Sequence, residues 1–220
     1  MCGRYTLTSV DPQAMAARFG VREAARLDPA TLGRFNVCPT EPIAIVTAEG
    51  EARTVRWGLV PPWPGPEPIN ARSESVAQRR PFAALLDRPE HRCLVLADGW
   101  YEWLRAEAGG ERLPFRYTVD GGGPFAFAGL WDATRTASAC ILTTAANVVC
   151  APVHDRMPCV LASPEVEEAW LAGERDGLLT PLEPARTAAA PANPEVNRAG
   201  VEGPRLLEPP PPPAQLSLLG

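Results

Sequence analysis

Short apolar runs recur along this chain, and glycine, proline or aspartate separates most of them. This pattern is typical of β-strands joined by turns. Strands are expected at Ile43–Thr47, Ala52–Val60, Cys93–Trp103, Phe115–Val119, Phe125–Trp131 and Ala139–Thr143. Because strands dominate and few helices lie between them, the pattern predicts an α+β fold. We expect a single β-rich domain with mostly antiparallel strands in a barrel-like sheet and a few flanking helices.

Helix signals are fewer than strand signals. Two short helices are expected at Asp11–Gly20 and Ser163–Gly173, and one helical turn at Pro81–Leu86. Each of the two helices begins with a side chain that can cap the first turn, continues with proline and ends at glycine.

The composition suits one domain with one core. The chain has 220 residues, of which 45% are hydrophobic. Its apolar runs are shorter than the roughly 18 residues that a membrane span needs, so no membrane partner is expected. The first residues lack the long apolar stretch of a secretory signal, which predicts a cytoplasmic protein whose six cysteines are free thiols.

A zinc site at Cys150, His154 and Cys159 is a possible alternative for three of these side chains. Their spacing is loose and no fourth ligand is evident, so we prefer ordinary buried thiols. No metal and no cofactor are expected.

The net charge of −5 is unevenly distributed. Residues 1–160 carry 17 arginines and 17 acidic residues, whereas residues 161–220 carry 4 arginines and 9 acidic residues. The body is therefore neutral, and any nucleic-acid site depends on where individual arginines lie. All 21 basic residues are arginine and the chain has no lysine, so its α-amino group is its only amine.

The chain becomes rich in proline and alanine from about residue 184. We expect a domain over residues 2–208, followed at 209–220 by a disordered polyproline spacer and C-terminal peptide. In that peptide, Gln215, Leu216, Leu218 and Leu219 resemble a short sequence that docks on the bacterial sliding clamp, with Leu219 in place of an aromatic anchor. A frayed tail without a partner is the alternative.

Cys2 is the first candidate for chemistry. It directly follows the initiator methionine and is small enough for Met1 to be removed, which would leave an amine and a thiol on neighbouring carbons. Such a 1,2-aminothiol condenses with an aldehyde, and the thiol then closes a thiazolidine ring because the second nucleophile is already in place. The α-amine titrates near ~7.7–8, so much of it is neutral near pH 7.

Two ionisable residues stand out in apolar or turn-like surroundings. Glu102 lies between aromatic residues in a strand-like run, where burial would raise the pKa of its carboxyl group and suit it to proton transfer. His154 precedes a turn-like stretch, and a structural histidine is the alternative there. His91, the other histidine, is expected to be a solvated loop residue.

Several collinear segments over about residues 2–162 resemble the SOS response-associated peptidase (SRAP) family. They are Met1–Tyr5, Arg34–Val37 with Pro39, Trp57–Pro61, Asn70–Glu74, Ala97–Trp103 and His154–Pro158. The resemblance implies a β-rich fold with an electropositive groove, in a monomer that binds single-stranded DNA containing abasic sites and associates with the nucleoid when bound.

The resemblance also implies roles for individual residues. After removal of Met1, the amine of Cys2 would attack the C1′ aldehyde of the ring-opened abasic sugar. Glu102 would hold and deprotonate that amine, His154 would act as acid and base in sugar ring opening, and Asn70 would position Cys2. The expected DNA-binding residues are Arg4, Arg72 and Arg80 on phosphates, Thr143 in the pocket, and Trp63 with Pro39 against bases.

Two other functions are compatible with the same residues. Cys2, His154 and Glu102 could serve as nucleophile, base and orienting group of a cysteine peptidase, with self-processing of Met1 as its narrowest form. A non-covalent single-strand binding module that shelters abasic DNA is the second alternative.

Overall fold

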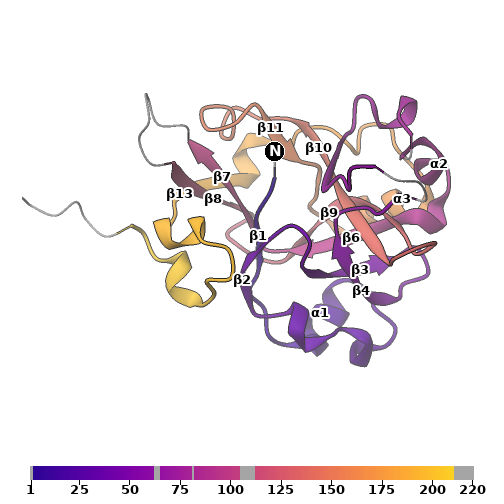
Figure 1. The fold of residues 1–220 in the computed structure, drawn as a ribbon, viewed down its shortest axis with the longest axis horizontal. Helices are drawn as coiled ribbons and strands as arrows, with labels where there is room; N and C mark the ends of the chain where they lie inside the picture. The colour runs from indigo at the N-terminus through magenta and orange to yellow at the C-terminus, as the bar shows by residue number, and fades with distance from the viewer. Residues whose placement is uncertain (1, 62–64, 81, 105–111, 211–220) are drawn as a thin grey trace, which may run out of the picture.

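The computed structural model describes residues 2–61, 65–80, 82–104 and 112–210. These residues form two β-sheets with short helices around them (Figure 1). The strands are β1 (Tyr5–Leu7), β2 (Arg34–Val37), β3 (Pro42–Thr47), β4 (Ala52–Trp57), β5 (Asn70–Arg72), β6 (Arg92–Ala97), β7 (Gly99–Leu104), β8 (Leu113–Val119), β9 (Phe125–Asp132), β10 (Ser138–Ala145), β11 (Arg156–Pro158), β12 (Val160–Leu161) and β13 (Thr187–Pro191). The α-helices are α1 (Pro12–Arg18), α2 (Phe82–Leu86) and α3 (Pro164–Ala172). Short 3-10 helices lie at Ala24–Arg26, Pro29–Thr31, Val76–Gln78, Pro89–His91, Pro184–Arg186, Pro194–Asn197 and Pro204–Leu207.

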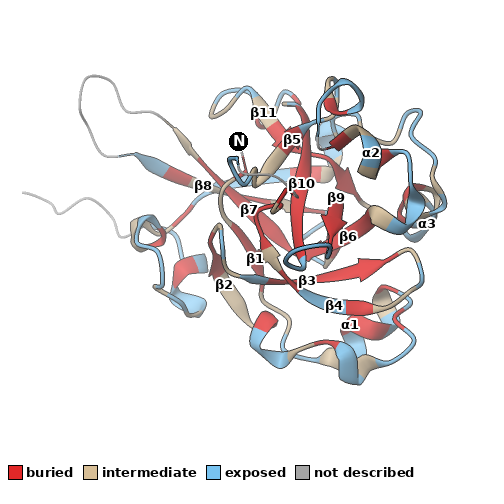
Figure 2. Ribbon diagram, turned by 45° about the vertical axis from the view of Figure 1, so that its right-hand side comes forward, coloured by how far each residue is buried: buried red, intermediate tan, exposed pale blue. Residues whose placement is uncertain are grey.

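The larger sheet closes on itself. Its strand order is β11-β10-β4-β3-β6-β9-β12, and β10 also pairs with β9, so β10, β4, β3, β6 and β9 form a ring. This closure confirms the barrel-like sheet predicted from the sequence. The pairs β4–β10 and β5–β10 are parallel, whereas the other pairs are antiparallel, so the sheet is mixed. Its strands are buried along most of their length (Figure 2).

The smaller sheet is antiparallel, with the order β13-β8-β7-β1-β2. The first strand of the chain therefore lies inside this sheet, paired with β2 on one side and β7 on the other. Tyr5 of β1 packs edge-on against Trp57 and Phe127 of the larger sheet, with ring centroids 5.3 and 5.9 Å apart. One continuous core thus joins the two sheets.

The sequence pattern predicted one strand from Cys93 to Trp103, and this prediction is wrong. The run breaks at Asp98 into β6 of the larger sheet and β7 of the smaller sheet. Gly99 is needed at this break because a Cβ atom there would lie 2.9 Å from the Arg116 side chain, the Thr6 hydroxyl and a backbone oxygen. The buried Asp98 carboxylate accepts hydrogen bonds from the side chains of Thr6 and Thr8 and from the Thr8 backbone N–H.

The predicted helices form with the expected caps. The Asp11 carboxylate accepts hydrogen bonds from the first turn of α1, and Ser163 caps α3, which ends at Gly173 with φ of +107°. The predicted turn at residues 81–86 is α2. The strand predicted at residues 52–60 is shorter and ends at Trp57. Among the described residues, no helix is both long and apolar enough to cross a membrane.

The proline-rich and alanine-rich segment after residue 184 packs on the smaller sheet. Strand β13 pairs with β8 over five residues. Val196 and Leu206, from the two 3-10 helices that follow, are fully buried. The predicted clamp-binding residues Gln215, Leu216, Leu218 and Leu219 lie outside the described residues.

We expect Asp98→Ala to lower the free energy of unfolding by about 3 kcal/mol, because it leaves buried donors of Thr6 and Thr8 without an acceptor. Urea denaturation measures this. The matched control is Asp87→Ala, which removes an exposed carboxylate paired with Arg175 and should cost less than about 0.5 kcal/mol. Equal losses for the two variants would show that Asp98 does not hold the junction.

Candidate active site

Cys2 lies at the seam between the two sheets. It precedes β1 of the smaller sheet by three residues, and its carbonyl accepts a 2.6 Å hydrogen bond from Nδ2 of Asn70 on β5 of the larger sheet. In the chain that carries Met1, Cys2 is fully buried. The predicted contact between Asn70 and Cys2 is therefore present, and it joins a residue of each sheet. The amino-terminal end of the chain lies between β7 and the β10–β11 pair (Figures 1 and 2).

Glu102 on β7 is the acidic group of this site, with 3% of its surface exposed. Burial raises the pKa of its carboxyl group to about 7, an effect that the positive charge of the amino terminus opposes and that Asp155 reinforces. Burial also raises the pKa of the Cys2 thiol, and the charge of Glu102 raises it further. The thiol is therefore protonated at neutral pH, while the carboxyl group is close to its midpoint.

His154 lies in the turn between β10 and β11. Its Nδ1 atom is 3.0 Å from the backbone N–H of Arg156 and 2.9 Å from a carboxylate oxygen of Asp155. A neutral ring with its proton on Nε2 accepts from the backbone, whereas a protonated ring donates to Asp155. The two neighbours thus provide a partner for Nδ1 in either protonation state. Since Asp155 acts electrostatically on Glu102, this turn faces the same site.

Arg156, which the sequence did not mark as a site residue, fixes the position of Thr143. Arg156 donates to the Thr143 carbonyl at 2.6 Å and to its hydroxyl at 3.2 Å. The same guanidinium forms two hydrogen bonds with the Glu74 carboxylate, which lowers the pKa of Glu74. Arg156 thereby ties β10 to the segment after β5. Its place in the His154–Pro158 segment was visible in the sequence, but its partners were not.

Two further buried residues, Cys150 and Tyr117, interact electrostatically with Glu102. Cys150 has its thiol pKa raised to about 12, by burial first and by Glu102 second. The pKa of the buried Tyr117 hydroxyl is raised by burial, and Cys150 and Glu102 add to the rise. Tyr117 stacks on Trp100 at a centroid distance of 5.2 Å. Tyr117 carried no signal in the sequence, because it reaches the site through the pairing of β8 with β7. Cys150, which lies in a turn, was noted in the sequence only as a candidate zinc ligand. Cys150 and Cys159 are buried, and neither forms a disulfide with a described residue.

Arg4, a predicted phosphate ligand, is turned toward the protein. It donates 2.6 Å hydrogen bonds to Oδ1 of Asn36 and to the Val196 carbonyl, and it lies 5.6 Å from the ring centroid of Trp103. Arg4 and Trp103 line an open cavity of about 380 Å³ together with Arg112. Arg4 is thus held in a fixed orientation at the edge of a cavity that Arg112 makes more positive.

The other predicted DNA-binding residues are more scattered. Arg72 is exposed at the end of β5, next to Asn70 in the strand. Pro39 is half-buried in the turn after β2, where Thr40 has φ of +74°. Arg80 is exposed but lies apart from Cys2, at the rim of a cavity next to α2. Trp63 lies outside the described residues.

The assembled site combines a buried thiol, a carboxyl group with a pKa near neutrality, an imidazole and an amide on the cysteine carbonyl. A thiol and a carboxyl group whose pKa values are both raised, within one site, are suited to proton transfer around a nucleophile.

Comparisons with known proteins identify the family of the chain. The SOS response associated peptidase (SRAP) family matches residues 1–199. The abasic site processing protein YedK of Escherichia coli is 32% identical over 204 residues, covering 88% of this chain and 89% of YedK. The abasic site processing protein YoqW of Bacillus subtilis is 32% identical over 188 residues, covering 78% of this chain and 80% of YoqW.

Solved structures show the same fold. A protein from Bordetella bronchiseptica superposes with a TM-score of 0.71 at 27% identity, covering 87% of this chain and all of that protein. A protein from Bacteroides thetaiotaomicron gives a TM-score of 0.80 at 20% identity, covering 95% of this chain and 99% of that protein, which supports the fold alone. Since both the family match and the relatives span most of its length, this chain belongs to the SOS response associated peptidase (SRAP) family.

Proposed function

We propose that this protein captures abasic sites in single-stranded DNA as a thiazolidine, formed by the amine and thiol of Cys2 after Met1 is removed. The relatives at about 30% identity are named abasic site processing proteins, which supports the substrate class. The observation that carries the proposal is the hydrogen bond from Asn70 to the Cys2 carbonyl, beside a carboxyl group with a pKa near 7. It holds the terminal residue still, next to a proton acceptor.

The reaction balances without a cofactor. Hydrolysis of the Met1–Cys2 peptide bond frees the Cys2 amine. That amine adds to the C1′ aldehyde of the open abasic sugar, and loss of water gives an imine. The Cys2 sulfur then adds to the imine carbon, its proton moves to the nitrogen, and the five-membered ring closes. Aldehyde and aminothiol thus give thiazolidine and one water.

Glu102 is proposed to carry the protons of these steps. With a pKa of about 7, its carboxyl group is partly deprotonated at neutral pH, so it can accept a proton from the ammonium group. The protonated carboxyl group can then donate to the hydroxyl that leaves as water. Because the buried thiol is itself protonated, Glu102 also serves as the acceptor for the thiol proton when the ring closes.

His154 is proposed to open the sugar ring. Nδ1 has a partner in both protonation states of the ring, so Nε2 can gain or lose a proton while the imidazole keeps its orientation. Thr143, fixed by Arg156, is proposed to line the sugar pocket. We further propose that Arg72 and Arg80 bind phosphates, with Arg4 at the site edge and Trp63 and Pro39 against bases.

A peptidase acting on other chains is a weaker candidate. Cysteine peptidases depend on a thiolate, and its formation requires a low thiol pKa. Here burial and Glu102 both raise the pKa of the Cys2 thiol. Peptidase chemistry is therefore proposed for the removal of Met1 alone.

The purified protein is expected to begin at Cys2 and to form a heat-stable adduct with an oligonucleotide that contains an abasic site. Denaturing gels and mass spectrometry measure both properties. Cys2→Ala should abolish the adduct, since it removes the thiol. Acetylation of the α-amine should also abolish it, whereas thiol-dependent peptide hydrolysis would survive acetylation. A mature protein that retains Met1 and still forms the adduct would contradict the mechanism.

Cys2→Ser keeps the amine and removes the sulfur. We expect it to form an imine that borohydride reduction traps, while the heat-stable adduct falls by at least about 100-fold because the imine is hydrolysed. Cys2→Ala serves as the matched variant, since it also keeps the amine. If Cys2→Ser gave adducts as durable as those of the unchanged protein, ring closure through sulfur would be disproved.

Glu102→Gln should slow adduct formation about 10²- to 10⁴-fold, the usual contribution of general acid–base catalysis. In the unchanged protein, the single-turnover rate should rise with pH through about 7 as the carboxyl group deprotonates. The variant should lose that inflection and keep the later rise from the α-amine near ~8. A rate profile with the same inflection in Glu102→Gln would assign that titration to another group.

The stability of the same variant provides the control. Since the folded state raises the pKa of Glu102 above its ordinary value of 4.5, the stabilisation is full below pH 4.5 and is lost as the pH rises through 7. The free energy of unfolding should fall by up to about 3 kcal/mol over that interval, and this slope should be absent in Glu102→Gln.

A further inference from the structure

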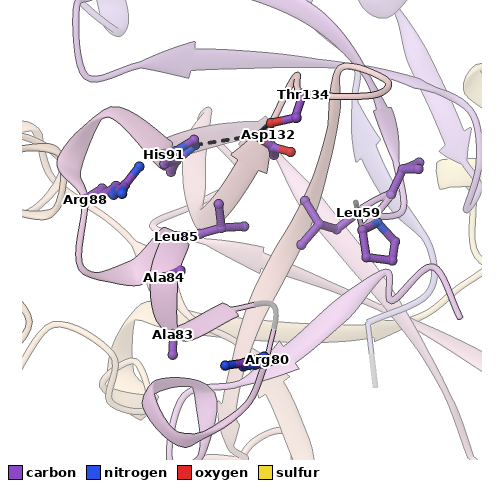
Figure 3. Close-up of a pocket in the computed structure, with 11 residues that line it drawn as sticks. Leu59, Arg80, Ala83, Ala84, Leu85, Arg88, His91, Asp132 and Thr134 are labelled. Carbon is purple, nitrogen blue, oxygen red and sulfur yellow. Dashed lines mark hydrogen bonds and ion pairs between the residues drawn. The ribbon is translucent and has the colours of Figure 1, made fainter. Parts of the chain in front are cut away.

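A second cavity lies next to α2, away from Cys2. It has a volume of about 460 Å³, within the range of small-molecule sites. Leu59, from the loop after β4, and Leu85 of α2 point toward one another from its two apolar walls (Figure 3). Val60, another lining residue, is fixed to the start of β10 by a 2.9 Å hydrogen bond from its N–H to Ser138. This hydrogen bond ties the loop after β4, which lines the cavity, to β10.

One chain segment, from Asn70 to Arg88, runs from the residue that contacts Cys2 to this cavity. Asn70, which binds the Cys2 carbonyl, is paired with Ile141 of β10, whereas the cavity lies at the level of Ser138. Three residues separate these two levels, which corresponds to roughly 10 Å along the strand. Stacked nucleotides rise about 3.4 Å per step, so the two sites are about three steps apart along this axis.

The same segment carries a row of unpaired positive charge. Arg72, Arg79, Arg80 and Arg88 are exposed, and none of them forms an ion pair with a described residue. The acidic residues of this segment, Glu74 and Asp87, are neutralised by arginines from elsewhere in the chain, Arg156 and Arg175. We call the four unpaired side chains the arginine row. Arg72 lies at the end of β5, and Arg80 and Arg88 line the cavity (Figure 3).

One end of the cavity is polar, and its residues His91, Asp132 and Thr134 also line a neighbouring open cavity. One Asp132 oxygen accepts a 2.8 Å hydrogen bond from Thr134, and the other oxygen accepts none from a described residue. Through Nδ1, His91 lies 3.1 Å from the Trp131 carbonyl and 3.9 Å from the Asp132 carboxylate, so Nδ1 carries a proton that the carbonyl accepts. His91 was predicted to be a solvated loop residue, which is wrong, since only 22% of its side chain is exposed. The apolar walls suit the faces of a base, the arginines at the rim suit a phosphate, and the Asp132 carboxylate at the polar end suits the amino group of a base. Together these groups match a nucleotide.

We propose that this cavity, the base pocket, takes one unstacked nucleobase of the bound strand a few nucleotides from the abasic site, while the arginine row binds the phosphates between them. The inference rests on the proposed function, since it concerns the same strand. The apolar walls cover the faces of the base, as stacking surfaces do in single-strand binders. The Asp132 oxygen that accepts no hydrogen bond from a described residue provides an acceptor for its edge, which favours bases with amino groups, above all guanine, over thymine.

The experiment scans 2-aminopurine, a base whose fluorescence rises when it leaves the stack, along a single strand. The strand carries a tetrahydrofuran analogue of the abasic site, which cannot react with Cys2. Fluorescence should rise at one position, two to five nucleotides from the analogue on one side. Ala84→Phe, which fills the pocket from α2, should remove this signal and weaken binding about five- to 100-fold, as expected for the loss of one stacked base.

Two controls keep the result specific. Ala17→Phe adds the same ring at an exposed position of α1 and should leave signal and affinity unchanged. Asp132→Asn should reduce the preference for guanine over thymine at the signalling position at least fivefold. A flat scan, or a positional signal that survives Ala84→Phe, would overturn the base pocket. If an acidic peptide is the true occupant, Ala84→Phe will not change any of the oligonucleotide measurements.

The two proposals fail separately. Adduct formation is measured on a trinucleotide with the abasic site in the middle, which extends only one nucleotide to each side and does not reach the pocket. A normal adduct with a flat scan would overturn the base pocket alone. A positional signal without any adduct would overturn thiazolidine formation and leave the base pocket standing.

Discussion

The pairing of β1 on both of its edges is the constraint on which the site depends. Chain termini usually fray unless secondary structure ties them down. Here β1 is hydrogen-bonded between β2 and β7, and Tyr5 is wedged against Trp57 and Phe127 of the other sheet. The residue three positions before this strand can therefore stay in one place. A terminal nucleophile is useful only if its position is as fixed as that of an internal side chain, and the interior position of β1 provides that.

The junction at Asp98 supplies the second half of the geometry. It sends the chain from the closed sheet into the smaller sheet, so that Glu102 follows four residues later beside the terminus. The water-poor surroundings of Glu102 bring its pKa to about 7, which is where a proton carrier works best at neutral pH. The fold thus tunes the carboxyl group by burial, and the charges of Asp155 and the amino terminus make smaller adjustments in opposite directions.

Local signals explain which parts of this structure were predictable. The helices were predictable because Asp11 and Ser163 cap their first turns and glycine follows their last turns. The strands were predictable because Gly, Pro and Asp separate the apolar runs. The break at Asp98 was missed because residues 93–103 read as one apolar run, and three-residue strands such as β5 carry no detectable period. Motifs and an unusual polar–apolar context singled out Cys2, Glu102, His154 and Asn70, and of their expected contacts the one between Asn70 and Cys2 is present. Arg156 and Tyr117 were not, because their contacts depend on the register of distant strands.

The seam between the sheets also has a consequence for how mutations are tolerated. Glu102 belongs to the smaller sheet, and Cys2 leads into it, whereas Asn70 and Thr143 belong to the larger sheet. Repacking the core could slide one sheet past the other by an ångström at little cost in folding free energy, yet a misplacement of that size can reduce a reaction rate about 100-fold. The catalytic rate should therefore respond to changes in core packing that leave the melting temperature unchanged. Amino-acid substitutions in the core should be poorly tolerated even where they lie far from Cys2.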